Sequence, residues 1–280
     1  MQDLYLVDLI FSAQCQIKSL PKFHAARWSA WFRFACHRAL IDWETNFVGV
    51  LPFRNSQRPI YPGELLRVRL YLTDEGYKNL NELTRAIATT DERGEFTCKS
   101  LKLIALVDAV SGEVQNRSCR LTPFNIRYLS SEYEKLIELE SFTLCFYSPL
   151  RLTLPPGFKS SSEKETSRYA HEDFFEYPFA LPHLCNSVRN FDAFLCEQDE
   201  TSILSTDLIW EDPAYNENEH KKIGGLTGKI TLGRIDSRDT ALKLIAGQYL
   251  GIGKNPRFAL GYYKIPELDC ARQIILPYSN

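Results

Sequence analysis

The sequence has no run of apolar residues near the roughly 20 that a bilayer-spanning helix requires. The N-terminal segment MQDLYLVDLIFSAQC has no basic stretch, and it contains Asp3 and Asp8, so it does not have the pattern of a signal peptide. We therefore interpret that segment as an alternating strand. With only 14 glycines and 14 prolines in 280 residues, the chain is not collagen-like or of low complexity. We expect a soluble, cytoplasmic protein with a packed core and no membrane partner.

Residue spacings typical of metal sites are missing as well. The eight cysteines are scattered, and no two of them form a CxxC pair. The five histidines form neither an HxxxH nor an HExxH pattern. The sequence therefore predicts reduced cysteines in the core, no metal site and no cofactor.

Basic and acidic residues are unevenly distributed behind a net charge of −2. Residues 15–69 carry nine Lys/Arg against three acids (+6), and residues 221–264 carry nine against two (+7). Residues 159–220 carry four against fourteen (−10) and are excluded from a phosphate-binding face by repulsion. The two basic segments could form one cleft for nucleic acid.

Hydrophobic periodicity predicts an α+β fold of two tandem ferredoxin-like domains, at residues 1–135 and 136–280. In the first half it predicts strands at 3–12, 64–73 and 101–110 and helices at 24–42 and 77–87. In the second half it predicts strands at 141–153, 228–235 and 258–265 and a helix at 240–250. Residues 155–220 mix turn signals with a helix expected at 183–196, and we assign no single element to them.

The strand at 64–73 alternates cleanly between apolar and polar positions. One face holds Leu66, Val68, Leu70 and Leu72, while the other holds Arg67, Arg69 and Tyr71. We predict that this second face is a basic outer face.

A glycine-rich segment, GQYLGIGKNPRFALGYYKI, stands between a predicted helix and a predicted strand. Its glycines and cations are Gly247, Gly251, Gly253, Lys254, Arg257 and Gly261. Glycine lets backbone approach a phosphate closely and lets successive N–H groups point the same way, while Lys and Arg neutralise charge. Asn255 follows Lys254, so this is not the P-loop of a nucleoside triphosphatase. The simpler alternative is a helix C-cap followed by a tight turn.

Together with IGGLTGKITLGRID and LTLCFYSPLRLTLP, this segment resembles the C-terminal half of the sixth Cas protein family, the CRISPR repeat-processing endoribonucleases of the RAMP superfamily. LPKFHAARWSAWFRF and IYPGELLRVRLYLT resemble the family's first helix and the strand that follows, so the resemblance covers most of the chain. It implies two ferredoxin-like domains, a catalytic histidine on or just after the first helix, and a glycine-rich loop that binds repeat RNA.

The resemblance also implies metal-independent cleavage, in which a ribose 2′-OH attacks the adjacent phosphate and leaves a 2′,3′-cyclic phosphate and a 5′-OH. Histidine suits the proton transfer, and Lys or Arg suits the stabilisation of charge. His37 is the first candidate, with Arg33 and Arg38 as phosphate stabilisers. His24, with Arg27 one turn along, is the second. The structural alternatives are a partly buried His37 among aromatic neighbours and a capping or surface His24.

The predicted RNA-binding residues are Gly247, Gly251, Gly253, Lys254, Arg257 and Lys229. The expected partners are precursor and mature CRISPR repeat RNA. A second hypothesis is a non-catalytic RAMP-type RNA-binding subunit of a CRISPR effector complex, because the family's histidine often falls slightly later, where this chain has residues 40–43. A third is an unrelated role on the same fold. Structural or surface roles are expected for His171, His183 and His220.

Overall fold

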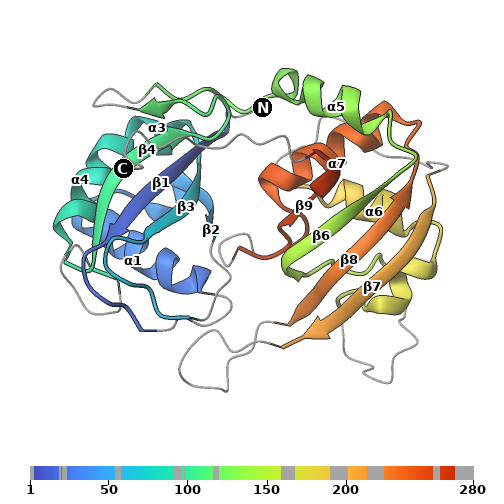
Figure 1. The fold of residues 1–280 in the computed structure, drawn as a ribbon, viewed down its shortest axis with the longest axis horizontal. Helices are drawn as coiled ribbons and strands as arrows, with labels where there is room; N and C mark the ends of the chain where they lie inside the picture. The colour runs from blue at the N-terminus through green and yellow to red at the C-terminus, as the bar shows by residue number, and fades with distance from the viewer. Residues whose placement is uncertain are drawn as a thin grey trace.

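The structure is a computed structural model. It describes residues 3–18, 20, 24–53, 58–90, 96–97, 99–115, 120–158, 168–189, 201–212, 224–254 and 259–268. Figure 1 shows two units side by side, each built on its own sheet. None of the described helices is both long and apolar enough to span a membrane.

The first unit is a five-stranded antiparallel sheet in the order β2-β3-β1-β4-β5. Its strands are β1 (Tyr5–Ala13), β2 (Phe47–Pro52), β3 (Leu65–Leu72), β4 (Leu101–Asp108) and β5 (Val114–Gln115). Its helices are α1 (Ala25–Arg38), α2 (Trp43–Asn46), α3 (Asp74–Lys78) and α4 (Leu80–Thr89). Taking α1 and α4 as the crossover helices, strands β1 to β4 have the β-α-β-β-α-β order of a ferredoxin-like unit.

The second unit repeats this topology in a sheet of order β7-β8-β6-β9. Its strands are β6 (Ser141–Leu150), β7 (Ile203–Glu211), β8 (Gly225–Gly233) and β9 (Tyr263–Lys264). Its helices are α6 (Ala180–Asn186) and α7 (Arg238–Leu250), with the 3-10 turns η2 (Glu172–Glu176) and η4 (Pro266–Leu268). Along the chain, η1 (Ile126–Leu129) and α5 (Ser130–Leu136) connect the last strand of the first sheet to the first strand of the second. The predicted tandem ferredoxin-like fold is confirmed, whereas a domain boundary at residue 135 stays a prediction.

Two strands carry no clear signal in the sequence. All but one of the side chains of β2 are buried, so β2 does not show a two-residue alternation. Strand β7 lies at the edge of its sheet with mostly exposed side chains, so it lacks an apolar face. The helix expected at 183–196 begins earlier, as α6, and residues 190–200 lie outside the described part of the chain.

Cysteine placement agrees only in part with the expected core positions. Cys36 and Cys185 are buried, Cys145 is half-buried, and Cys15 is exposed, all four as free thiols. The remaining four cysteines are outside the described residues. Burial raises the pKa of the Cys36 thiol to about 12, with Asp42 adding to the rise, so this thiol is protonated at neutral pH.

Strand β3 places Leu66, Val68, Leu70 and Leu72 in the core of the first unit, as predicted. The prediction of a basic outer face is wrong, because Tyr71 is 1% exposed and Arg69 is 6% exposed. The ring of Tyr71 lies 5.6 Å from that of Tyr262 in the second unit. This face of β3 is therefore internal, and it lies between the two units.

Helix α1 stops at Arg38, so the helix predicted to continue to residue 42 is wrong over its last turn. Leu40 adopts the left-handed conformation, with φ of 58°, and its side chain is 94% exposed. The N–H of Ile41 donates to the carbonyl oxygen of Cys36 at 2.9 Å, which closes the helix end in the manner of a Schellman motif.

We expect Leu40→Gly to raise the free energy of unfolding by about 0.5–1 kcal/mol. The left-handed conformation costs a leucine roughly 1–2 kcal/mol, while glycine adopts it freely at the expense of some unfolded-state entropy. The measurement is the midpoint of urea unfolding at unchanged slope. Leu40→Ala is the control, since it keeps the Cβ and should bring no such gain. A Leu40→Gly midpoint at or below that of the parent would show that this backbone is not strained.

Candidate nucleic-acid interface

The glycine-rich segment begins inside α7 and runs to β9. Gly247 is buried within α7, where an added Cβ would collide with the hydroxyl of Tyr263. Close helix–sheet packing thus accounts for this glycine by itself. Its predicted contact with RNA remains a prediction.

Beyond α7 the backbone turns through residues with positive φ, at 75° for Gly251, 73° for Gly253 and 70° for Gly261. A Cβ on Gly253 would meet the carbonyl oxygen of Arg151, and one on Gly261 would meet that of Ile252. Only glycine combines this conformation with so close a backbone approach.

The amide groups at residues 251–254 are directed into the protein. The N–H of Gly253 donates to the carbonyl oxygen of Ser187 (3.0 Å) and that of Lys254 to the carbonyl oxygen of Arg151 (3.0 Å). Those of Gly251 and Ile252 likewise donate to backbone carbonyls, at 2.8 Å. At these four positions the expected cradle of N–H groups for a phosphate is therefore not present. Arg257 lies outside the described residues.

Arg189 holds the two arms of the loop together, and nothing in the sequence indicated it. Its Nε donates to the carbonyl oxygen of Gly253 (2.8 Å), and its Nη2 donates to those of Ile252 (2.8 Å) and Lys254 (3.3 Å). The same Nη2 donates to the carbonyl oxygen of Leu260 on the returning arm. Burial lowers the pKa of this guanidinium, yet an arginine stays charged at neutral pH.

A group of cations adjoins the loop. The guanidinium of Arg151 lies 4.3 Å from the ring centre of Tyr169, and that of Arg168 lies 5.2 Å from it. The side chain of Lys254 is exposed, and its backbone N–H donates a hydrogen bond to the carbonyl oxygen of Arg151. We call Arg151, Arg168, Tyr169 and Lys254 the loop-side cluster. Cations around an aromatic ring suit the phosphates and bases of a single strand.

A second basic feature crosses the sheet of the second unit. In the β-ladder Cys145 pairs with Lys229 on one side and with Lys264 on the other, so the three side chains share a face. Both lysines are exposed. Burial raises the pKa of Cys145, although Lys229 partly opposes the rise. Lys229 thus stands in a cross-strand row with a lysine that the sequence did not single out.

The two candidate histidines lie in opposite environments. His37 is exposed near the end of α1 beside the exposed Arg38, so it is not a core histidine among aromatic side chains. His24 is 2% exposed at the start of α1, where its carbonyl accepts the N–H of Arg27. Only His37 is accessible to RNA without rearrangement. Arg33 is exposed and paired with Glu44 at 3.1 Å.

Two other histidines have structural contacts. The ring of His171 stacks on that of Trp210 with centroids 4.4 Å apart, and Nε2 of His183 lies 2.6 Å from the carbonyl oxygen of Thr153. His220 lies outside the described residues. Across the described ranges, no group of three or more His, Cys, Asp or Glu is arranged to hold a metal ion.

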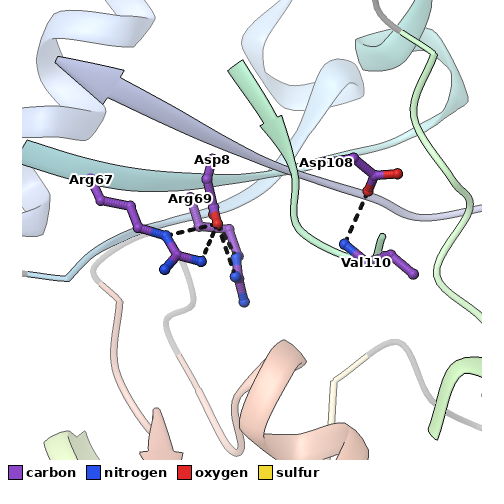
Figure 2. Close-up of polar contacts among 5 residues, drawn as sticks. All are labelled: Asp8, Arg67, Arg69, Asp108 and Val110. Atoms are coloured by element: carbon purple, nitrogen blue, oxygen red, sulfur yellow. Dashed lines mark hydrogen bonds and ion pairs between the residues drawn. The ribbon is translucent and has the colours of Figure 1, made fainter. Parts of the chain in front are cut away.

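The internal face of β3 carries a buried charge cluster that Figure 2 shows. Asp8 is fully buried and lies between two guanidiniums. Its Oδ1 accepts from Nε of Arg69 (2.8 Å), and its Oδ2 accepts from Nε of Arg67 (2.8 Å), from Nη2 of Arg69 (3.1 Å) and from Nη2 of Arg67. The same figure shows Asp108 turned away from the pair, toward Val110.

These features define a tandem ferredoxin-like protein with a glycine-rich loop before its last strand. Over 95% of this chain, the fold is similar to that of a chain in a partial Cas6-RT-Cas1–Cas2 complex, with TM-score 0.70 and 16% identity over 46% of that chain. A chain of a Cas6-RT-Cas1–Cas2 complex gives the same TM-score and identity, with 29% of its length covered. This chain thus spans less than half the length of either.

Thermus thermophilus Cas6 also matches 95% of this chain and 99% of its own length, with TM-score 0.44 and 13% identity. No family model matches the sequence, and no curated protein matches it. The resemblance to the sixth Cas family is confirmed at the level of fold, so the protein has a Cas6-like architecture.

Proposed function

We propose that this protein binds CRISPR repeat RNA and cleaves it by metal-independent attack of a ribose 2′-OH on the adjacent phosphate. The observation that carries the proposal is the fold likeness, at TM-score 0.70 over 95% of the chain, to chains of Cas6-RT-Cas1–Cas2 complexes. The glycine-rich loop, held in shape by Arg189 and flanked by exposed cations, supports it. Precursor and mature CRISPR RNA are the proposed partners.

In this proposal the loop-side cluster and Lys229 hold the RNA. The guanidiniums of Arg151 and Arg168 and the ammonium of Lys254 neutralise phosphates, while the ring of Tyr169 offers a base-stacking surface. The position of Lys254 is fixed by the hydrogen bond from its backbone N–H to the carbonyl oxygen of Arg151. Binding is therefore expected to weaken steeply with salt.

Catalysis in this proposal falls to His37 as general acid or base. Its ring is exposed, histidine is the side chain best suited to proton transfer at neutral pH, and the neighbouring Arg38 is available to stabilise charge on the phosphate. Arg33 is the weaker candidate because Glu44 already pairs with it. His24 would have to leave its buried position before it could reach RNA.

The test is to incubate the protein with repeat RNA in EDTA and to map the product ends for wild type, His37→Ala and His24→Ala. We expect a 2′,3′-cyclic phosphate product and a loss of about 10²–10⁴-fold in rate for His37→Ala, the usual contribution of general acid–base catalysis. His24→Ala should lose stability and keep its rate per folded molecule. A rate unchanged in His37→Ala would remove this residue from the mechanism.

The second candidate is a non-catalytic RNA-binding subunit of a CRISPR effector complex. It is favoured by the early end of α1 and by the absence of histidine from residues 40–43. Tight binding of repeat RNA by wild type without any cleavage would support this candidate over the nuclease.

A further inference from the structure

A cavity of about 260 Å³ lies between the two units. The first unit contributes Phe53, Arg67 and Asp108 to its wall, helix α5 contributes Glu132, and the second unit contributes Lys264. None of these residues belongs to the loop-side cluster or to the His37 region. The proposed function leaves this cavity unexplained.

The cavity carries an excess of positive charge among the described residues. Its wall holds Arg67, Arg69, Lys135 and Lys264. With Asp8 counted, three carboxylates oppose these four cations, which leaves one net positive charge. Lys135 and Lys264 are exposed, whereas Arg69 is buried and Arg67 is partly buried, so the excess charge costs most at the arginine pair.

The two carboxylates on the wall have hydrogen-bond partners other than the arginine pair. Asp108 accepts the N–H of Val110 (3.0 Å), the hydroxyl of Ser111 (2.9 Å) and the N–H of Thr122 (2.9 Å). Glu132 accepts the hydroxyl of Tyr249 at 2.9 Å. Neither acid bonds to Arg67 or Arg69, so these two guanidiniums share the single carboxylate of Asp8.

Within the pair, Arg67 is the less compensated cation. Burial acts to lower the pKa of Arg69, but Asp8 outweighs it and raises that pKa. For Arg67, burial lowers the pKa despite Asp8, and the neighbouring Arg69 adds to the fall. The side chain of Arg67 is 33% exposed, against 7% for Arg69. Its Nη1 makes no hydrogen bond to any of the described residues.

We propose that this cavity is a phosphate-binding site, with Arg67 as its principal ligand and Lys264, from the second unit, as a further one. Guanidinium and ammonium donors are the groups that bind phosphate oxygens most strongly. The volume lies below the ~300–1,000 Å³ of sites for drug-sized ligands, so the occupant is one nucleotide unit or smaller. Lys264 also belongs to the cross-strand row with Lys229, which gives a strand bound on that sheet a path into the cavity.

The phosphate has two sources, a free nucleotide or one unit of a single-stranded RNA; the second rests on the proposed function. The test measures, by calorimetry at low salt, the binding of inorganic phosphate, adenosine 5′-monophosphate and an unstructured RNA tetranucleotide. The variants are Arg67→Met, which leaves Asp8 paired one-to-one with Arg69, and Lys264→Met, whose side chain does not touch Asp8. Arg85→Met removes the same charge from an exposed pair on α4 and serves as the control.

We expect Arg67→Met and Lys264→Met to weaken phosphate and mononucleotide binding at least tenfold, with Arg85→Met unchanged. Tetranucleotide binding lost in the same variants would assign the site to an RNA strand; its persistence would assign it to a free nucleotide. Equal binding of every probe by Arg67→Met, Lys264→Met and Arg85→Met would overturn the proposal. Cleavage of repeat RNA by wild type is scored separately, so the site and the proposed function can fail independently.

Discussion

Replacing Arg189 with methionine is expected to lower the free energy of unfolding by about 4 kcal/mol and to weaken the binding of repeat RNA at least tenfold. The carbonyls of Ile252, Gly253, Lys254 and Leu260 would all lose the donor that holds them. Each buried acceptor left unpaired costs about 1–3 kcal/mol, and relaxation of the loop recovers part of the total. Without the hydrogen bonds of Arg189, the loop no longer holds Lys254 beside Arg151.

Urea unfolding and RNA titration together separate the structural role of Arg189 from the role of the loop. Arg168→Met is the matched control, because it removes an exposed guanidinium next to the same loop. We expect this control to keep its stability and to lose RNA affinity with a reduced salt slope. If Arg189→Met lost stability while its folded fraction bound repeat RNA with wild-type affinity, the loop would not be an RNA-binding element.

Asp8→Asn is expected to lower the free energy of unfolding by about 3–5 kcal/mol at neutral pH. The change leaves the buried Arg69 and the partly buried Arg67 without their carboxylate, and an unpaired buried charge carries a penalty of that size. Glu82→Gln provides the contrast, because its pair with Arg85 is exposed and should contribute little. Equal losses of unfolding free energy in Asp8→Asn and Glu82→Gln would mean that the buried cluster stabilises the fold no more than an exposed ion pair does.

The same carboxylate predicts a dependence on pH. Burial alone would raise the pKa of Asp8, but Arg69 and Arg67 outweigh burial and hold the pKa below its ordinary value. The stabilisation is therefore complete above the unfolded-state pKa of about 3.9 and is lost as the pH falls through the lower folded-state pKa. Unfolding measured from pH 7 to pH 2 should show this acid loss in wild type and a smaller one in Asp8→Asn.

Helix α7 was predicted although residues 240–247 are buried without interruption. Local pattern was sufficient where apolar and polar residues alternate in the sequence: the alternation at 64–73 specified β3 with its core-facing Leu66, Leu70 and Leu72, and the helical period specified α1. It was insufficient for β2, which is almost wholly buried, and for β7, which is mostly exposed, because neither has a contrast between its two faces. The tandem fold was then predicted because the β-α-β-β-α-β order occurs twice in the chain.

The candidate site was only partly accessible to sequence reasoning. Lys254 and the glycines stood out because they are close together in the chain. Arg189 did not, because the carbonyls that it binds lie 63 to 71 residues away and because Arg189 itself lies inside a segment counted as acidic. The accessibility of His37 and the burial of His24 likewise follow from packing around α1.

By itself the sequence determined the α+β class, most of the strands and helices, and the resemblance to a family of RNA-processing proteins. Hydrophobic periodicity and short motifs carry that information because they depend only on residues two to four positions apart in the chain. Tertiary structure alone decided that Arg67 and Arg69 face Asp8 and the second unit, and that Arg189 shapes the loop. A sequence pattern shows which side chains share a face; only the packing of distant segments determines what covers that face.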